Sequence, residues 1–79
     1  MLQLLLQDLQ VGETALIVAI VEGNRAYRAK LLALGLLPGT LFQVIRKAPL
    51  GDPIELQIRG YRLTLRQGEA ALLKVQKVE

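Results

Sequence analysis

Apolar and polar residues alternate along residues 54–66, and this alternation predicts a β-hairpin. One phase is apolar throughout: Ile54, Leu56, Ile58, Tyr61, Leu63 and Leu65. Successive side chains of a strand point to opposite faces, so these side chains are expected to face inward. If residues 59–60 form a two-residue turn, Ile58 lies opposite Tyr61 and the other inward residues pair in the same register. The predicted strands are Ile54–Arg59 and Tyr61–Arg66.

The first twenty residues are predicted to hold a short helix and a strand. Leu2–Leu9 carries leucines at helical spacing, which indicates one or two helical turns that end at Val11-Gly12. Thr14–Val21 is rich in β-branched residues, and this composition is typical of a strand that is buried on both faces.

A second helix is predicted over Arg25–Leu34. Asn24 is a favourable N-cap, because its side-chain oxygen can accept a free amide of the first turn. Gly35 stands where a left-handed residue ends a helix, and Leu36 after it can contact Leu31. One face of the helix is expected to be apolar: Tyr27, Leu31 and Leu34.

The remaining segments complete a small β fold. Leu41–Lys47 and Ala71–Lys77 are predicted strands, and Gln67–Ala70 is a predicted short turn of helix. The two prolines, glycine and aspartate of Ala48–Pro53 make that segment a connection. We therefore expect residues 1–79 to form one domain, mainly β with a short helix. Its expected architecture is an SH3-like five-stranded barrel, in the order strand, helix, four strands.

The composition argues against an enzyme. The 79 residues include no cysteine, histidine, serine or tryptophan. This absence removes the Ser-His and Cys-His nucleophile pairs, the histidine general base and most zinc sites. Hydrophobic residues make up 52% of the chain, more than a small core can bury, so part of them is expected at an interface with a partner or a second copy.

Charge and hydropathy indicate a cytoplasmic protein without membrane insertion. The net charge is +3, and residues 41–79 carry all of it. Met1–Leu9 has no basic residue ahead of its leucines, unlike a signal peptide. The longest apolar run, Ala15–Val21, is far shorter than the roughly 20 residues that a membrane helix needs.

Three segments resemble the FeoA family: LLALGLLPGT (31–40), APLGDPIELQIRGYRLTLR (48–66) and EAALLKV (69–75). LQVGETALIVAI (9–20) is similar to the first strand of that family and its approach. The resemblance implies a small SH3-like protein of bacterial ferrous iron uptake that works beside FeoB, a membrane transporter with a cytosolic GTPase domain. A similar domain forms the C-terminus of metal-dependent repressors of the DtxR type.

The best candidate for a partner-binding site is the loop between the predicted strands Leu41–Lys47 and Ile54–Arg59: Pro49, Leu50, Gly51, Asp52 and Pro53. Prolines stiffen a loop, and a stiff loop loses little entropy on docking. Leu50 at its tip is either an exposed apolar anchor or a residue of a structural connector that folds back to cap the end of the barrel. Arg25 and Arg28 lie at a helix N-terminus that disfavours cations, so an acidic partner surface is one interpretation and plain solvation is the other. Leu36 and Leu37 are expected to add exposed apolar area.

Other functions have weaker support in the sequence. Asp52 and Glu55 are the nearest carboxylate pair, so we expect no cofactor and at most weak binding of Fe(II) or another divalent metal. A basic strip from the second half could attract nucleic acid, but aromatic residues for stacking are few, and no nucleic acid partner is expected. The leading hypothesis is an accessory protein that contacts an FeoB-type transporter, and the alternatives are a metal-responsive regulatory module and, less favoured, a nucleic-acid-binding barrel.

Overall fold

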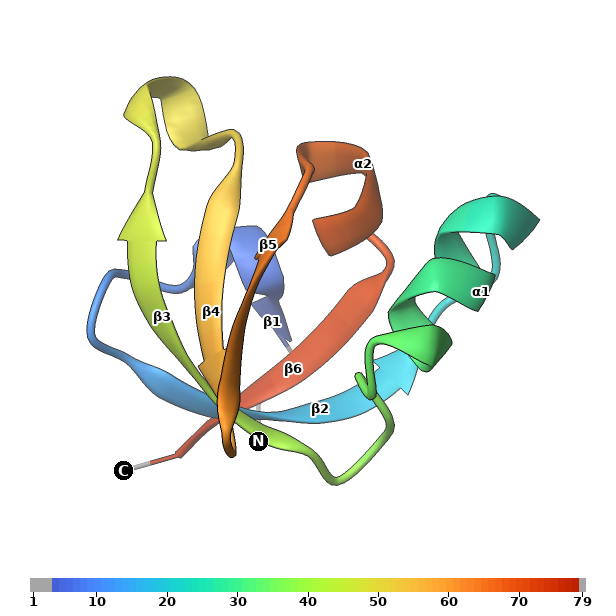
Figure 1. The fold of residues 1–79 in the computed structure, drawn as a ribbon, viewed down its shortest axis with the longest axis horizontal. Coiled ribbons are helices and arrows are strands. Elements are labelled where there is room, and N and C mark those ends of the chain that lie inside the picture. The colour runs from blue at the N-terminus through green and yellow to red at the C-terminus, as the bar shows by residue number, and fades with distance from the viewer. Residues whose placement is uncertain (1–3, 79) are drawn as a thin grey trace.

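The computed structural model describes residues 4–78, which form one antiparallel sheet with the strand order β1-β6-β2-β3-β4-β5. The sheet curls on itself, with β3, β4 and β5 rising from the crossing strands β2 and β6 (Figure 1). Two α-helices and two 3-10 turns join the strands. Their bounds are β1 (Leu4–Leu5), η1 (Leu6–Asp8), β2 (Thr14–Ile20), α1 (Arg25–Ala33), β3 (Leu41–Lys47), η2 (Pro49–Gly51), β4 (Ile54–Ile58), β5 (Tyr61–Leu65), α2 (Gln67–Ala70) and β6 (Leu73–Val78).

The mainly β architecture with a short helix is confirmed, but the described residues hold six strands and not five. The extra strand is β1, in which Leu4 pairs with Val75 and Leu5 with Lys74. The helical turns predicted over Leu2–Leu9 are therefore largely wrong, since only η1 is helical; Met1 to Gln3 lie outside the described residues. The same spacing of leucines is compatible with a short strand followed by one 3-10 turn, because this conformation also brings leucines into the core. Leu6 and Leu9 are fully buried.

The hairpin of β4 and β5 has the predicted register. Ile58 pairs with Tyr61, Leu56 with Leu63 and Ile54 with Leu65, around the two-residue turn at 59–60. Five of these side chains are buried. Tyr61 has the predicted phase but is not buried, because it starts the strand at an open end of the sheet and stays 42% exposed. Its hydroxyl reaches α1 and donates a hydrogen bond to the Leu34 carbonyl.

Helix α1 begins and ends as its sequence predicts. The Asn24 side-chain oxygen accepts the N–H groups of Ala26 and Tyr27, at 2.8 and 3.1 Å. At the other end Gly35 has a φ of 88°, and the Leu36 N–H bonds the Leu31 carbonyl at 3.0 Å. This is the expected Schellman stop.

The apolar face predicted for α1 is only partly correct. Leu31 is buried and Leu34 packs against the core at its edge, but Tyr27 is 40% exposed. Helix α1 lies beside the end of β2, at the border of the sheet, so a single row of its side chains reaches the core (Figure 1). The stop at Gly35 then turns the chain inward and buries Leu36 completely.

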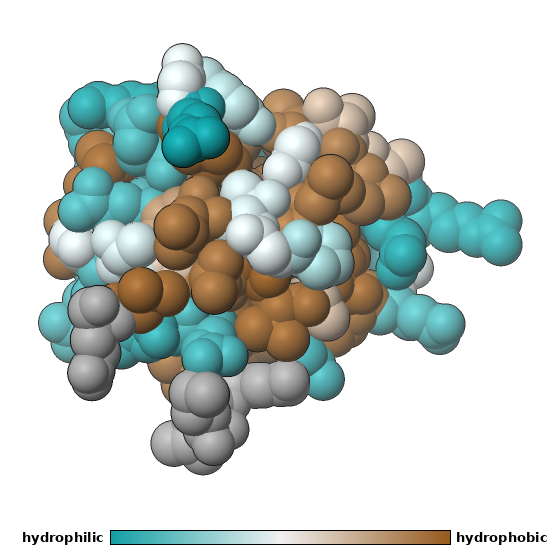
Figure 2. Space-filling model, turned by 90° about the horizontal axis from the view of Figure 1, so that it is seen from below, coloured by the Kyte–Doolittle hydropathy of each residue, from teal (hydrophilic) through white to brown (hydrophobic). Residues whose placement is uncertain are grey.

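Strand β2 is buried on one face and not on two. Ala15 and Ile17 point into the core, whereas Leu16 and Val18 are half-buried. The curled sheet encloses the core on its inner face. The outer face of β2 is partly exposed to solvent. Leu16 pairs there with Leu41, which is 53% exposed, and apolar side chains gather over much of this underside of the molecule (Figure 2).

Candidate partner-binding surface

The loop from Ala48 to Pro53 is held firmly at its base. The Ala48 N–H bonds the Pro53 carbonyl at 3.0 Å and closes the loop. The Asp52 carboxylate accepts the Gln67 N–H at 3.0 Å, which fixes the loop to the start of α2. Pro49 opens the turn η2 at a helix-compatible position, and the Asp52–Pro53 peptide bond is cis. These bonds fix both ends of the loop, while Pro49, Leu50 and Asp52 are exposed to solvent.

Leu50 forms the tip of this loop. Its side chain is fully exposed, at 101% of the reference area, so it does not fold back onto the barrel. Its φ is +70°, in the left-handed region, which costs a residue with a Cβ about 1–2 kcal/mol. Burying a leucine side chain in a partner is worth about 1.5–3 kcal/mol. A leucine that is both strained and wholly exposed contributes nothing to this fold, and both features fit an anchor for another molecule.

Arg25 and Arg28 line a separate hollow of about 370 Å³ with Glu22 and Gly23. One Arg28 nitrogen donates to the Ile20 carbonyl at 3.5 Å, a weak bond that holds the side chain over the end of β2. The amides of the first turn are already taken by the cap residue. Helix α1 and turn η2 lie on opposite sides of the molecule (Figure 1), so the structure does not bring these arginines together with Leu50.

The two leucines after α1, Leu36 and Leu37, differ in burial. Leu36 is fully buried and cannot contact a partner, which corrects its assignment as an exposed residue. The cause is the Schellman stop, which directs the residue after the glycine back toward the helix. Leu37 is 48% exposed, as expected.

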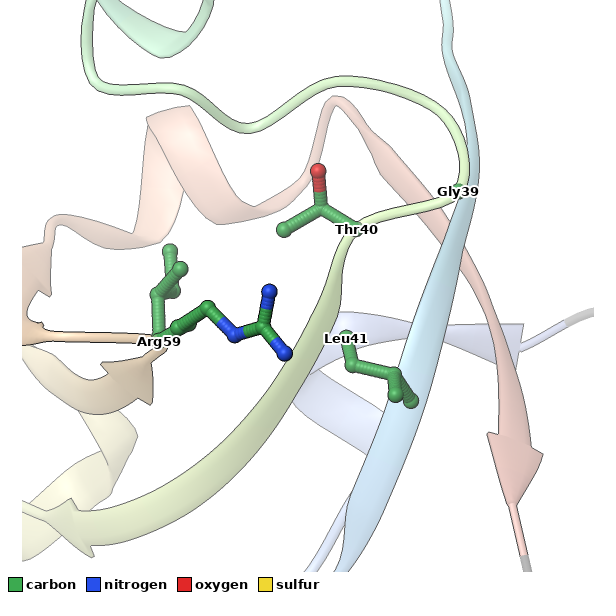
Figure 3. Close-up of a pocket in the computed structure, with 5 residues that line it drawn as sticks. Gly39, Thr40, Leu41 and Arg59 are labelled. Carbon is green, nitrogen blue, oxygen red and sulfur yellow. The ribbon is translucent and has the colours of Figure 1, made fainter.

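The sequence reasoning missed Leu41 as a surface residue. Phe42 and Val44 are buried, so the alternation along β3 already places Leu41 on the outer face. It borders a hollow of about 400 Å³ with Gly39, Thr40, Ile58 and Arg59. The Arg59 side chain extends across this hollow toward the start of β3 (Figure 3).

Two carboxylates have shifted titration. Burial raises the pKa of Glu69, but the Lys30 ammonium at 2.6 Å and the Arg66 N–H at 2.9 Å outweigh it, so this pKa lies below its ordinary value. A side-chain hydrogen bond from Lys77 lowers the pKa of Glu13, and the Gln10 N–H lowers it further. Both carboxylates are ionised at neutral pH and hold elements together.

The described residues offer no ready metal site. Within residues 4–78, no three His, Cys, Asp or Glu side chains gather closely enough to hold an ion. Asp52 is bonded to the Gln67 amide, and Glu55 lies 3.7 Å from the Arg46 guanidinium, so the nearest carboxylate pair is directed elsewhere.

Among residues 4–78, none of the helices has the length and apolar character that a membrane span requires.

The chain belongs to the FeoA family: the sequence model of the FeoA domain matches residues 4–77. A curated relative is the Fe(2+) transport protein A/Fe(2+) transporter FeoB fusion protein of Porphyromonas gingivalis, 36% identical over 73 residues. The match covers 92% of this chain but only 8% of the fusion protein. The family predicted from the motifs is thereby confirmed.

Solved structures confirm the fold. An FeoA-like protein from Clostridium acetobutylicum is 32% identical with a TM-score of 0.87, covering 98% of this chain and 88% of that one. FeoA of Stenotrophomonas maltophilia, solved with zinc and described as an SH3 domain protein, is 26% identical with a TM-score of 0.80, over 92% of this chain and 89% of that one. A manganese-dependent transcriptional repressor shares the fold at 16% identity, with a TM-score of 0.89 over 96% of this chain and 37% of the repressor.

Proposed function

We propose that this protein is a non-enzymatic accessory protein of bacterial ferrous iron uptake, acting in the cytoplasm by contact with an FeoB-type transporter. The observation that carries the proposal is Leu50, which is fully exposed at the tip of a fixed loop. The fusion protein of Porphyromonas gingivalis supports the choice of partner, since its name joins an FeoA to an FeoB. Such a covalent link raises the effective concentration of one module at the other.

The contact that we propose has Leu50 as its apolar anchor and the prolines beside it as its stiff frame. The partner surface is then an apolar pocket on the cytosolic GTPase domain of the transporter. Arg25 and Arg28 belong to α1, which lies on the other side of the molecule from η2 (Figure 1), so they would meet a separate part of the partner. Leu37 follows that helix in the chain and is not assigned to the contact at Leu50. Basic residues at the rim of a contact mainly set orientation and association rate.

Binding to the purified cytosolic domain of an FeoB transporter, by calorimetry with and without GTP, tests this proposal. Leu50→Asp is expected to weaken binding roughly 10-fold or more, because a buried leucine is worth about 1.5–3 kcal/mol. Leu32→Asp is the matched control, since Leu32 is an exposed leucine on α1. Equal binding by the Leu50 variant and the parent would remove the loop from the contact.

A metal-responsive regulatory module is the second candidate, because the relative from Stenotrophomonas maltophilia was solved with zinc. Anaerobic calorimetry with Fe(II) on the isolated chain separates the two candidates. Low-micromolar binding would favour metal sensing. An accessory protein that acts by docking needs no such affinity.

A further inference from the structure

Strand β5 is a free edge of the sheet. It pairs with β4 only, at one end of the strand order, and no other described strand flanks it. In a hairpin with a two-residue turn, the pairs at Ile58/Tyr61 and Leu56/Leu63 exchange hydrogen bonds, so the backbone groups between them face away. On β5 those groups belong to Arg62 and Thr64. Within residues 4–78, neither residue has a backbone bond to another element.

This edge has few of the features that usually block an added strand. Edge strands are typically protected by proline, by a bulge, by a covering helix or by charged side chains, and of these β5 carries only the charge of Arg62. The register of β4 with β5 runs without a bulge, and β5 contains no proline. Arg62 and Thr64 are both exposed. Four backbone groups, two N–H donors and two carbonyl acceptors, are thus available in an extended segment.

The side chains along the edge carry positive charge. Arg62 and Arg66 stand two positions either side of Thr64, on the outer face, and Arg59 stands in the adjoining turn. Among the described residues none of these three guanidinium groups forms an ion pair with a carboxylate. The Arg62 Nε donates to Gln57 Oε1 at 2.7 Å, which orients it without neutralising it.

The acidic groups nearby are committed elsewhere. Glu55 lies opposite Thr64 but is directed toward Arg46, and Asp52 accepts the Gln67 N–H. The Glu69 carboxylate pairs with Lys30 and accepts the Arg66 N–H, and the charge of the Arg66 side chain acts on it more weakly than these two bonds. The edge therefore keeps an unmatched positive charge that a partner can complement.

We infer that the β5 edge is a second recognition surface, which takes an extended acidic peptide segment by strand addition. The outward backbone groups of Arg62 and Thr64 bond the added strand, and Arg62 and Arg66 select carboxylates on it. Four residues of strand span about 13 Å, so the best segment carries acidic residues at positions i and i+4. A β-branched residue between them lies opposite Thr64 and packs across the strands.

A synthetic peptide with blocked ends, Thr-Glu-Val-Thr-Val-Glu-Thr, tests the inference against the full chain. Amide resonances of Arg62 and Thr64 are expected to shift. Their hydrogen exchange is expected to slow about 10-fold when the free peptide is at ten times its dissociation constant. The Leu63 amide, which already bonds to β4, is the internal reference. Peptides with lysine at both glutamates, or proline at the central threonine, are expected to bind much more weakly.

Charge reversal provides the second arm. Arg62→Glu is expected to lower affinity for the acidic peptide roughly fivefold and to raise affinity for the lysine peptide. Leu50→Asp is expected to bind the acidic peptide like the parent, so this result is independent of the transporter contact. Three outcomes would overturn the inference: no shift up to millimolar peptide, shifts confined to residues 48–53, or equal binding of the acidic and lysine peptides. A fourth result would also overturn it: if the Arg62→Glu variant self-associates and the parent binds no peptide, the arginines serve only to prevent edge-to-edge pairing of two copies.

Discussion

Replacement of Glu69 by alanine is expected to be among the most damaging changes of a polar residue in this chain. Glu69 is the buried charged residue of the described part, at 4% exposure. One of its oxygens binds the Lys30 ammonium at 2.6 Å, and the other accepts the Arg66 N–H at 2.9 Å. The residue thus joins α1 to α2 and caps the start of α2. Alanine removes both bonds and leaves the Arg66 N–H without its partner.

The two bonds contribute unequally. Lys30 is about half exposed, at 49%, so water can replace the carboxylate and the ion pair is worth at most about 1 kcal/mol. A hydrogen bond to an ionised group contributes about 1.5–3 kcal/mol, and the Arg66 N–H loses that bond. The substitution also removes the cost of burying the Glu69 charge, which offsets part of the stability lost with the two bonds. We expect Glu69→Ala to lower the free energy of unfolding by about 2 kcal/mol, a large share of the roughly 5 kcal/mol available to a small domain.

The effect depends on pH in a defined direction. The pKa of Glu69 is below its ordinary value of 4.5 in the folded protein. The stabilisation is therefore present above the unfolded-state pKa, and it is lost as the pH falls through the lower folded-state pKa. The stability difference between the parent and Glu69→Ala is expected to narrow in acid.

Urea denaturation followed by far-UV circular dichroism measures this difference at neutral pH and below the lowered pKa. Glu69→Gln is the matched control, because it keeps an acceptor for the Arg66 N–H and loses only the charge; it is expected to cost about half as much as alanine. A Lys30→Met double-mutant cycle isolates the ion pair. The reasoning fails if Glu69→Gln costs as much as Glu69→Ala, or if acid leaves their difference from the parent unchanged.

Other substitutions test the surface and the turn after α1. Leu50→Gly is expected to raise the free energy of unfolding by about 0.5 kcal/mol in thermal or urea unfolding, because it removes a leucine in the left-handed region that buries no surface. The same change is expected to weaken transporter binding. A loss of stability would contradict the strain assigned to Leu50. Leu36→Ala is expected to cost about 2–4 kcal/mol and Leu37→Ala less than about 0.5 kcal/mol, and similar losses would contradict their opposite burial. Gly35→Ala is expected to cost at least about 1 kcal/mol, because its φ is +88° and a Cβ would lie 2.7 Å from the Tyr61 hydroxyl; the Tyr61→Phe background should reduce that cost.

Local chemistry made much of the fold predictable. The hairpin register followed from the alternation of residues 54–66 and from an even turn, because any odd slip would expose the apolar phase. The limits of α1 followed from Asn24 and Gly35, whose preferences act within one turn of the chain. The short helix Gln67–Ala70 was also predicted correctly.

The errors concern tertiary position. Tyr61 has the correct phase but stands at the open end of the sheet, where the residues after α1 reach its hydroxyl and leave 42% of the residue exposed. Leu36 and Leu37 are adjacent and equally apolar, and only the path of the chain after Gly35 decides which one is buried. Strand β1 depends on pairing with β6, about 70 residues along the chain, which no local pattern reveals. For the candidate site, composition suggested the loop but left open whether Leu50 is exposed or folds back onto the barrel, and it did not indicate that Leu41 joins an outer apolar face.

The pairing of β1 with β6 bears on how the domain can be tethered. Leu4 lies beside Val75, so the described chain enters and leaves through neighbouring strands. Turn η2 lies at the other extreme of the molecule from the end of β6 (Figure 1). A larger protein joined after β6 would thus hold the domain at the end opposite to η2. Leu50 would then point away from the point of attachment.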